Sequence, residues 1–135
     1  MVATANRIEA LPPELLRKGR FDEIFFIDLP SCAERRDIFR IHLRRRQRDP
    51  LRYDLDALAT SAEGFSGSEI EQAVIAGMYY AFGERTELRQ EHLVKAVEEA
   101  FPLSSTMGEE ITRLREWSQN RTRPASAAQR LAVVR

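Results

Sequence analysis

The sequence predicts a mostly α-helical chain that opens with the remains of one or two β-strands. The run "EIFFIDLP" (23–30) is compact and apolar, contains β-branched and aromatic residues, and ends at a proline. These features are typical of a buried strand of about six residues. From Ser31 onward the apolar residues recur at helical spacing instead. Apolar and charged residues make up 43% and 31% of the chain, which is ordinary for a soluble globular protein.

The residues before this run predict two weaker elements. Residues 1–5 (MVATA) are compatible with a strand, and the pattern breaks at Asn6. Pro12 and Pro13 are placed to open a short helical turn and Gly19 to end it, because proline suits the first turn of a helix and glycine the position after its end. Two strands without partners are at best marginal in water. We therefore expect either another chain or another part of the same protein to complete the sheet.

Two helix starts are marked by a serine followed three positions later by a glutamate, which is the pattern of a capping box. Ser31 with Glu34 predicts a helix that runs to about residue 47. Ser66 with Glu69 predicts another. Its buried face would consist of Ile70, Ala73, Val74, Gly77, Met78 and Ala81.

Further helices follow from weaker signals. Asp54 or Asp56 is expected to cap a short helix between the two just described. Residues 90–101 carry apolar side chains at helical spacing, and Thr106 is placed to begin a third capping box. After about Asn120 the apolar period is lost, which predicts a flexible tail.

Charge and cysteine content exclude several classes of protein. The 21 basic and 21 acidic residues cancel, so net charge gives no indication of nucleic-acid or membrane binding. No stretch approaches the roughly 20 apolar residues that span a bilayer, and no signal peptide is visible. Cys32 is the only cysteine, which excludes an intrachain disulfide and a thiolate-based metal site. These features predict a cytoplasmic protein that has no metal site in this chain.

Two stretches resemble one protein family. "TANRIEALPPELLRKGRFDEIFFIDLP" (4–30) is similar to the second half of the AAA+ ATPase module. In that module a strand ends in Thr-Asn-Arg, a Leu-Arg-x-Gly-Arg-Phe-Asp block follows, and the next strand ends in Leu-Pro. "GFSGSEIEQAV" (64–74) resembles the Gly-Phe-Ser-Gly-Ala-Asp-Leu stretch that opens a helix of the AAA lid domain. Within the family, the chain looks most like the poorly characterised AAA ATPases of cyanobacteria and algal plastids.

The resemblance implies a domain organisation and a fold class. Residues 1–30 would be the end of an α/β P-loop ATPase core, so their strands would be remnants of that core. Residues 31–103 would form the helical-bundle lid. Residues 104–120 would add a C-terminal helix, and 121–135 a flexible tail. The phosphate-binding Gly-x-x-x-x-Gly-Lys-Ser/Thr loop and the acidic residues that hold Mg²⁺ are not in this sequence, and we expect them upstream.

By the same resemblance, Asn6 matches sensor 1, a polar residue at a strand end that orients the attacking water. An amide suits that task because it can donate to a phosphate and accept from water at once. An asparagine that only closes a strand into a turn is the alternative.

Arg17 and Arg20 match arginine fingers, which act on the nucleotide of a neighbouring subunit. A guanidinium stays charged and forks onto phosphate oxygens, which suits a transition state with spread negative charge. Two solvated arginines paired with Asp22 or Glu23 are the alternative.

His42, Gly67 and Ser68 match lid positions beside the ribose or adenine. A glycine at such a place permits close backbone approach. Ser68 and Glu69 replace the more frequent Ala-Asp, and an ordinary half-buried histidine on an amphipathic helix is the alternative for His42.

The implied activity belongs to a longer protein. That protein would bind ATP with Mg²⁺ and couple hydrolysis to the remodelling of an unidentified protein substrate, as a homo-oligomeric ring, expected to be a hexamer. The present chain alone is predicted not to hydrolyse ATP and to bind ATP or ADP weakly or not at all.

Two other functions stay open at this point. The helices could form a stand-alone protein-interaction module without ATPase activity, its front strands being completed by a partner or by a swapped copy of the same chain. The basic run Arg44–Arg48 could bind nucleic acid, although cations are favoured near any helix C-terminus and the run has no interleaved aromatic residues to stack bases.

Overall fold

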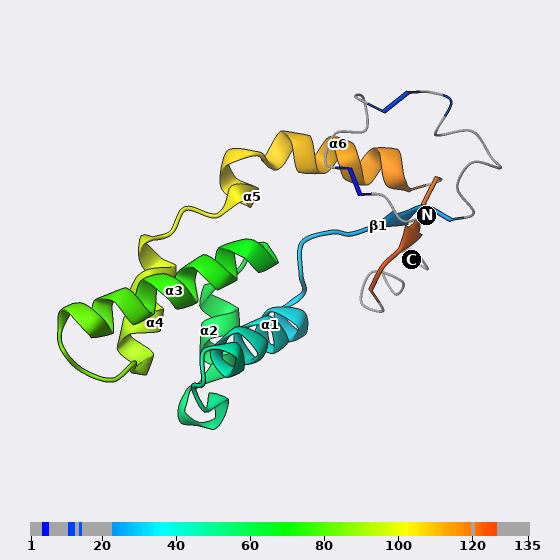
Figure 1. The fold of residues 1–135 in the computed structure, drawn as a ribbon. Helices are drawn as coiled ribbons and strands as arrows, with labels where there is room; N and C mark the ends of the chain where they lie inside the picture. Colours follow the sequence, from blue (N-terminus) through cyan, green and yellow to red (C-terminus); the bar gives the residue numbers. More distant parts are fainter. Residues whose placement is uncertain (1–3, 6–10, 13, 15–22, 120, 127–135) are drawn as a thin grey trace. The chain divides into compact units, whose positions relative to one another are not determined.

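The computed structural model describes residues 4–5, 11–12, 14, 23–119 and 121–126. The chain divides into two compact units. One runs from Leu29 to Gly108, and the other combines the described residues of 1–28 with those of 109–135. The prediction of a mostly α-helical chain with short remnant strands is confirmed (Figure 1).

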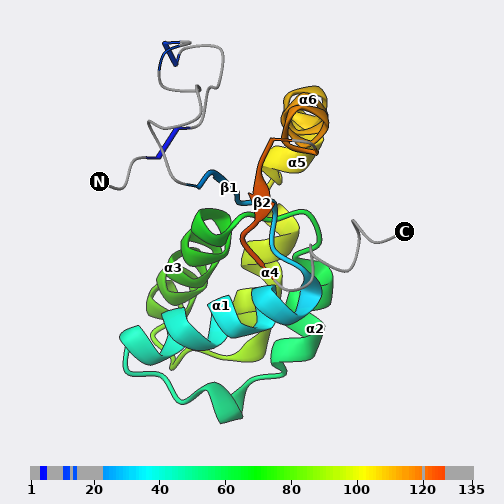
Figure 2. The same cartoon turned by 90° about the vertical axis from the view of Figure 1, so that its right-hand side faces the viewer.

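The unit from Leu29 to Gly108 is built from helices. They are α1 (Cys32–Arg45), the short 3₁₀ helix η3 (Pro50–Arg52), α2 (Leu55–Ser61), α3 (Gly67–Gly83), α4 (Gln90–Glu99) and α5 (Leu103–Thr106). Helix α3 packs against α4 and α1, and α1 also packs against α2 (Figure 2). The largest fully buried side chains come from all four longer helices: Phe39, Leu43, Leu58, Ile70, Val74 and Leu93.

Two of the predicted capping boxes are confirmed. Ser31 Oγ accepts a hydrogen bond from the Glu34 amide, and the Glu34 carboxylate accepts one from the Ser31 amide at 2.8 Å. Ser66 caps α3 in the same way with Glu69 as its partner. Each box satisfies two amides that the first turn of a helix would leave unbonded.

At the two remaining helix starts, the predicted cap of α2 is confirmed and the predicted capping box at Thr106 is not. Of the two candidate aspartates, Asp54 caps α2, because its Oδ1 accepts from the Ala57 amide at 2.9 Å. The predicted box of Thr106 with Glu109 is wrong. Thr106 is the last residue of α5, and its hydroxyl donates to the Leu103 carbonyl at 3.2 Å. The next helix, α6 (Gly108–Ser118), therefore begins without it.

The other unit contains a two-stranded parallel sheet and most of α6. Strand β1 (Phe25–Phe26) pairs with β2 (Arg123–Pro124). The predicted buried strand of about six residues is wrong in length and burial, since the side chains of Phe25 and Ile27 are 53% and 78% exposed. Within the described residues only β2 pairs with this run, so its apolar side chains are not covered as a central strand would cover them. Strand β2 also lies in the segment expected to be an aperiodic tail.

Several expected features lie outside the described residues. Of the possible strand at 1–5 only Thr4 and Ala5 are described, and the helical turn from Pro12 to Gly19 is described only at Pro12 and Glu14. Among the residues that are described, no helix has the length and apolar character that crossing a bilayer requires.

Candidate functional site

The lid residues predicted from the sequence, His42, Gly67 and Ser68, lie on α1 and α3, which pack against each other. A methyl group at Gly67, the first residue of α3, would lie 3.7 Å from Ile38 Cδ1 of α1. One turn further along each helix, His42 Nδ1 lies 3.4 Å from Glu71 Oε1. His42 and the start of α3 therefore occupy successive turns of one helix pair.

His42 is held by two charged neighbours. Its ring nitrogen Nδ1 lies 3.4 Å from Arg46 Nη1 as well as from Glu71, and Arg46 Nη2 donates to Glu71 Oε1 at 3.0 Å. Desolvation of the half-buried ring lowers its pKa below 6.5, as do the charges of Arg46 and Arg45, while Glu71 opposes them. The imidazole is therefore mainly neutral at pH 7.

The start of α3 combines a side-chain cap with two small residues, the partly buried Gly67 and the exposed Ser68. Ser66 Oγ accepts from the Glu69 amide at 3.4 Å and lies 3.2 Å from the exposed Ser68 Oγ. At Gly67 an added Cβ would make only ordinary van der Waals contact. The chain's own packing therefore does not require glycine there, and a close approach by a ligand stays a prediction.

Glu69 also joins the start of α3 to α5, a contact that sequence reasoning missed. Its Oε2 accepts from the Ser66 amide at 2.7 Å, and its Oε1 accepts from the Leu103 amide at 2.6 Å. Burial raises the pKa of Glu69, but the hydrogen bonds from Ser66 and Leu103 outweigh it and leave the pKa below its usual value. The capping pattern predicts the first contact and gives no signal for the second, because Leu103 is 34 residues away.

Gly64 fixes α5 from the other side of the same block. Its φ of +78° lies in the left-handed region, and an added Cβ would lie 2.3 Å from Ser104 Oγ. The block from 64 to 69 thus opens α3 and contacts the first turn of α5.

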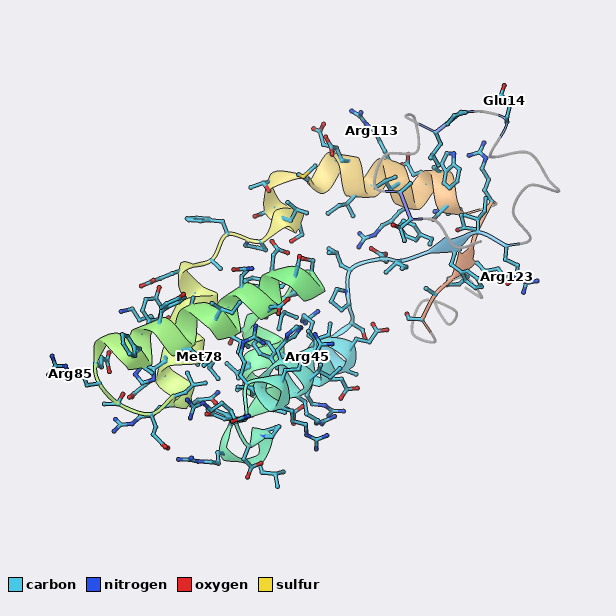
Figure 3. All side chains as sticks on the ribbon, in the orientation of Figure 1. Glu14, Arg45, Met78, Arg85, Arg113 and Arg123 are labelled. Atoms are coloured by element: carbon cyan, nitrogen blue, oxygen red, sulfur yellow. The ribbon has the colours of Figure 1, made fainter. Side chains whose placement is uncertain are left out.

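The basic run at the end of α1 is partly occupied by structural contacts. Arg46 is bonded to Glu71 and to the His42 carbonyl, and its backbone amide caps α1. Arg44 and Arg45 lie in the last turn of α1, where the helix dipole favours positive charge. Arg45 is labelled in Figure 3. The contacts of Arg46 are therefore structural and do not require nucleic acid.

The remaining predicted site residues, Asn6, Arg17 and Arg20, lie outside the described residues. Across the ranges that are described, no three His, Cys, Asp or Glu side chains cluster in a way that could hold a metal ion.

Comparison with known proteins identifies the class to which this chain belongs. It is 48% identical over 128 residues to "Uncharacterized AAA domain-containing protein ycf46" of Pyropia yezoensis, covering 93% of this chain and 26% of that protein. The protein of the same name from Guillardia theta is 43% identical over 119 residues, which cover 87% of this chain and 24% of the relative. A "Proteasome-activating nucleotidase" of Sulfurisphaera tokodaii is 39% identical over 100 residues, covering 73% of this chain and 25% of that protein. No protein-family model matches.

The chain belongs to the AAA+ family, and its resemblance to the C-terminal part of an AAA+ ATPase module is confirmed. It spans about a quarter of the length of these curated relatives.

Proposed function

We propose that this chain is the part of an AAA+ ATPase that supplies sensor 1, the arginine fingers and the adenine-side lid. The observation that supports the proposal is that His42 lies against Glu71, one turn beyond Gly67 on the packed pair α1 and α3, in a chain related to AAA proteins over most of its length. The lid would be the helices between 31 and 103, and the residues before them the end of the ATPase core.

In this proposal the nucleotide would be ATP, held partly by residues of this chain. The backbone at Gly67 and Ser68 would lie beside the base, and the neutral ring of His42 would pack near the ribose or adenine. When bound, Mg²⁺ would neutralise developing charge on the phosphates. Its ligands would come from upstream residues, since the described ones hold no suitable cluster.

Asn6 would orient the attacking water from its strand end. Arg17 and Arg20 would reach the γ-phosphate bound by the next subunit, where a finger supplied in trans contributes about 10³–10⁵ in rate. The whole protein would then work as a homo-oligomeric ring, a hexamer by our prediction, and remodel a protein substrate. It would act in the cytoplasm.

The finger assignment is tested by mixing two inactive forms of the longer protein. One form carries Arg20→Ala, and the other carries a disabled phosphate-binding loop with its arginines intact. We expect ATP turnover to return on mixing, because each form supplies what the other lacks. If Arg20→Ala hydrolyses ATP at the unmodified rate, the finger assignment is refuted while the family assignment stands.

The lid assignment is tested with Gly67→Ala in the same longer protein. The fold accepts a methyl group there, so a loss of adenine-nucleotide affinity reports on the ligand and not on unfolding. Gly83→Ala is the matched control, because nothing lies within 4 Å of the added methyl at the end of the same helix. Equal affinity of both variants would contradict a close contact at Gly67.

One observation favours the alternative of a protein-interaction module. Tyr79 and Phe82 on α3 are 71% and 81% exposed, which is unusual for a helix face that has no partner. Such a module would bind a protein and show no ATPase activity in any longer form. Turnover by the mixed subunits would exclude it as the sole function.

A further inference from the structure

The segment after α6 adds a strand beside residues 24–26. The Arg123 amide donates to the Ile24 carbonyl at 2.8 Å, and the Ala125 amide donates to the Phe26 carbonyl at 3.0 Å. Residues almost a hundred positions apart thus share a parallel ladder, with Phe25 opposite Arg123 and Phe26 opposite Pro124. The proline removes one donor, so these two hydrogen bonds are the backbone contribution of this pair.

Two ion pairs also bind the run 23–28, one from α6 and one from β2. Arg115 of α6 forks onto Asp28, with Nε 2.8 Å from Oδ2 and Nη2 2.8 Å from Oδ1. Arg123 Nη1 lies 2.7 Å from Glu23 Oε1. The Arg115 fork fixes direction as well as distance, because a planar guanidinium meets a carboxylate side by side. The run 23–28 is therefore bound by an ion pair at each end and by the two backbone hydrogen bonds between them.

We propose that the described residues between 109 and 125 act as a clasp that positions the arginine-finger segment through the run 23–28. The inference rests on the proposed function of Arg17 and Arg20. Glu23, the first gripped residue, follows Arg20 by only three positions.

A finger that acts across a subunit boundary has to be presented in a fixed direction, since misplacement by about 1 Å can cost a hundredfold in rate. The run 23–28 has exposed apolar side chains at Phe25 and Ile27, so in this chain burial contributes little to holding it in place. The clasp supplies directional contacts instead. Arg115, Arg123, Asp28 and Glu23 are positioning residues in this scheme, and none of them touches the nucleotide.

The grip itself is tested by hydrogen exchange on the present chain. We expect the amides of Arg123 and Ala125 to be protected in the unmodified chain and to exchange at least tenfold faster in Arg115→Ala. Arg113→Ala is the matched control, because Arg113 lies two residues away on α6 (Figure 3), and its ion pair among the described residues is an exposed one with Glu109 at 3.9 Å. The amides of α3 and α4 serve as an internal reference for folding and should not change in either variant.

A charge exchange separates a direct contact from general damage. Asp28→Arg should speed the exchange of both amides, and adding Arg115→Asp should restore at least part of the protection. Random-coil exchange of Arg123 and Ala125 in the unmodified chain would overturn the clasp, and so would equal effects of Arg115→Ala and Arg113→Ala.

The positioning role is tested by the mixed subunits described above, with Arg115→Ala placed in one form at a time. In the form that only donates a finger, it should lower the recovered turnover at least tenfold. In the form that only binds nucleotide, it should leave turnover within about twofold, a difference that a merely structural role would not produce. Equal loss in both placements would overturn the positioning role. If the unmodified pair fails to recover turnover, the proposed function and the positioning role fall together, while amide exchange still decides the clasp.

Discussion

Replacing Gly64 with alanine should destabilise the helical unit for two separable reasons. The residue has a φ of +78°, and the left-handed conformation costs a residue with a Cβ about 1–2 kcal/mol. The new Cβ would also lie 2.3 Å from Ser104 Oγ and 3.3 Å from Ser104 Cβ. The hydroxyl can rotate away, but the Ser104 Cβ moves only with the backbone of α5, and such overpacking typically costs about 1–3 kcal/mol.

Together these terms predict a loss of about 2–5 kcal/mol in the free energy of unfolding. For a unit of this size, the lower value already means a melting temperature about 8 °C lower. Thermal unfolding followed by far-ultraviolet circular dichroism would measure the change. Gly83→Ala is the control, because its added methyl meets nothing within 4 Å and alanine is favoured in a helix by up to about 1 kcal/mol.

A double-mutant cycle with Ser104→Gly separates the two causes. In that background the steric part disappears, and Gly64→Ala should cost only the conformational part of about 1–2 kcal/mol. The reasoning is refuted if Gly64→Ala unfolds at the same temperature as Gly83→Ala. An identical cost with and without the Ser104 side chain would refute the packing part alone.

Three further outcomes follow from the same unit. Gly77→Ala should lower the free energy of unfolding by about 1–3 kcal/mol, because its methyl would lie 3.3 Å from a backbone carbonyl of α4 that cannot rotate away. An unchanged midpoint of chemical unfolding would contradict that packing. His42 should titrate below 6.5 by NMR, and lower still in Glu71→Gln, because the Glu71 charge raises its pKa. Because the folded pKa of His42 is depressed, the stability that the imidazole contributes is present above pH 6.5 and is lost as the pH falls below it. A titration midpoint of His42 above 6.5 would refute the lowered pKa. Glu69→Gln should weaken the contact between Glu69 and the Leu103 amide of α5 by about 1–2 kcal/mol at neutral pH, which would be measured as faster exchange of that amide. In the unmodified protein the protection of Leu103 should be lost as the pH falls below 4.5, because the folded pKa of Glu69 is also depressed. Equal protection of the Leu103 amide at neutral pH and in acid, each measured against its intrinsic exchange rate at that pH, would argue against the contact.

The sequence predicted the features of this fold that depend on near neighbours. The boxes at Ser31 and Ser66 join residues three positions apart, so their hydrogen bonds follow once a helix forms at all. The contact of Arg35 with the Ala59 carbonyl, 2.8 Å long and buried, joins α1 to α2 and could not be predicted in this way. It depends on the register between two helices, which local patterns do not specify.

In the candidate site, too, the sequence indicated single residues but not the contacts that depend on how the helices are aligned. Similarity to a family indicated His42 and the start of α3, whereas Glu71, which is paired with His42, was missed. Its involvement depends on how α1 and α3 are aligned, since it lies one turn beyond Gly67. The strand at 23–30 was predicted too long for a related reason. Its apolar composition suits a buried strand, but burial comes from neighbours in a sheet, and only β2 lies beside it among the described residues.

The two residues that fix α5 also bracket the proposed adenine side of the lid. Gly64 precedes Gly67 by three positions, and Glu69 directly follows Ser68. Any displacement of α5 has to break the Glu69 contact with Leu103 or move Ser104 off Gly64. Either change alters the contacts at one end of the short backbone stretch that carries Gly67 and Ser68. A variant such as Gly64→Ala should therefore alter nucleotide affinity in the longer protein even though Gly64 itself need not touch the nucleotide. Gly67→Ala, which the fold accepts, should alter that affinity without lowering stability. The two glycines of one block are thus distinguishable by experiment, one through stability and affinity together and the other through affinity alone.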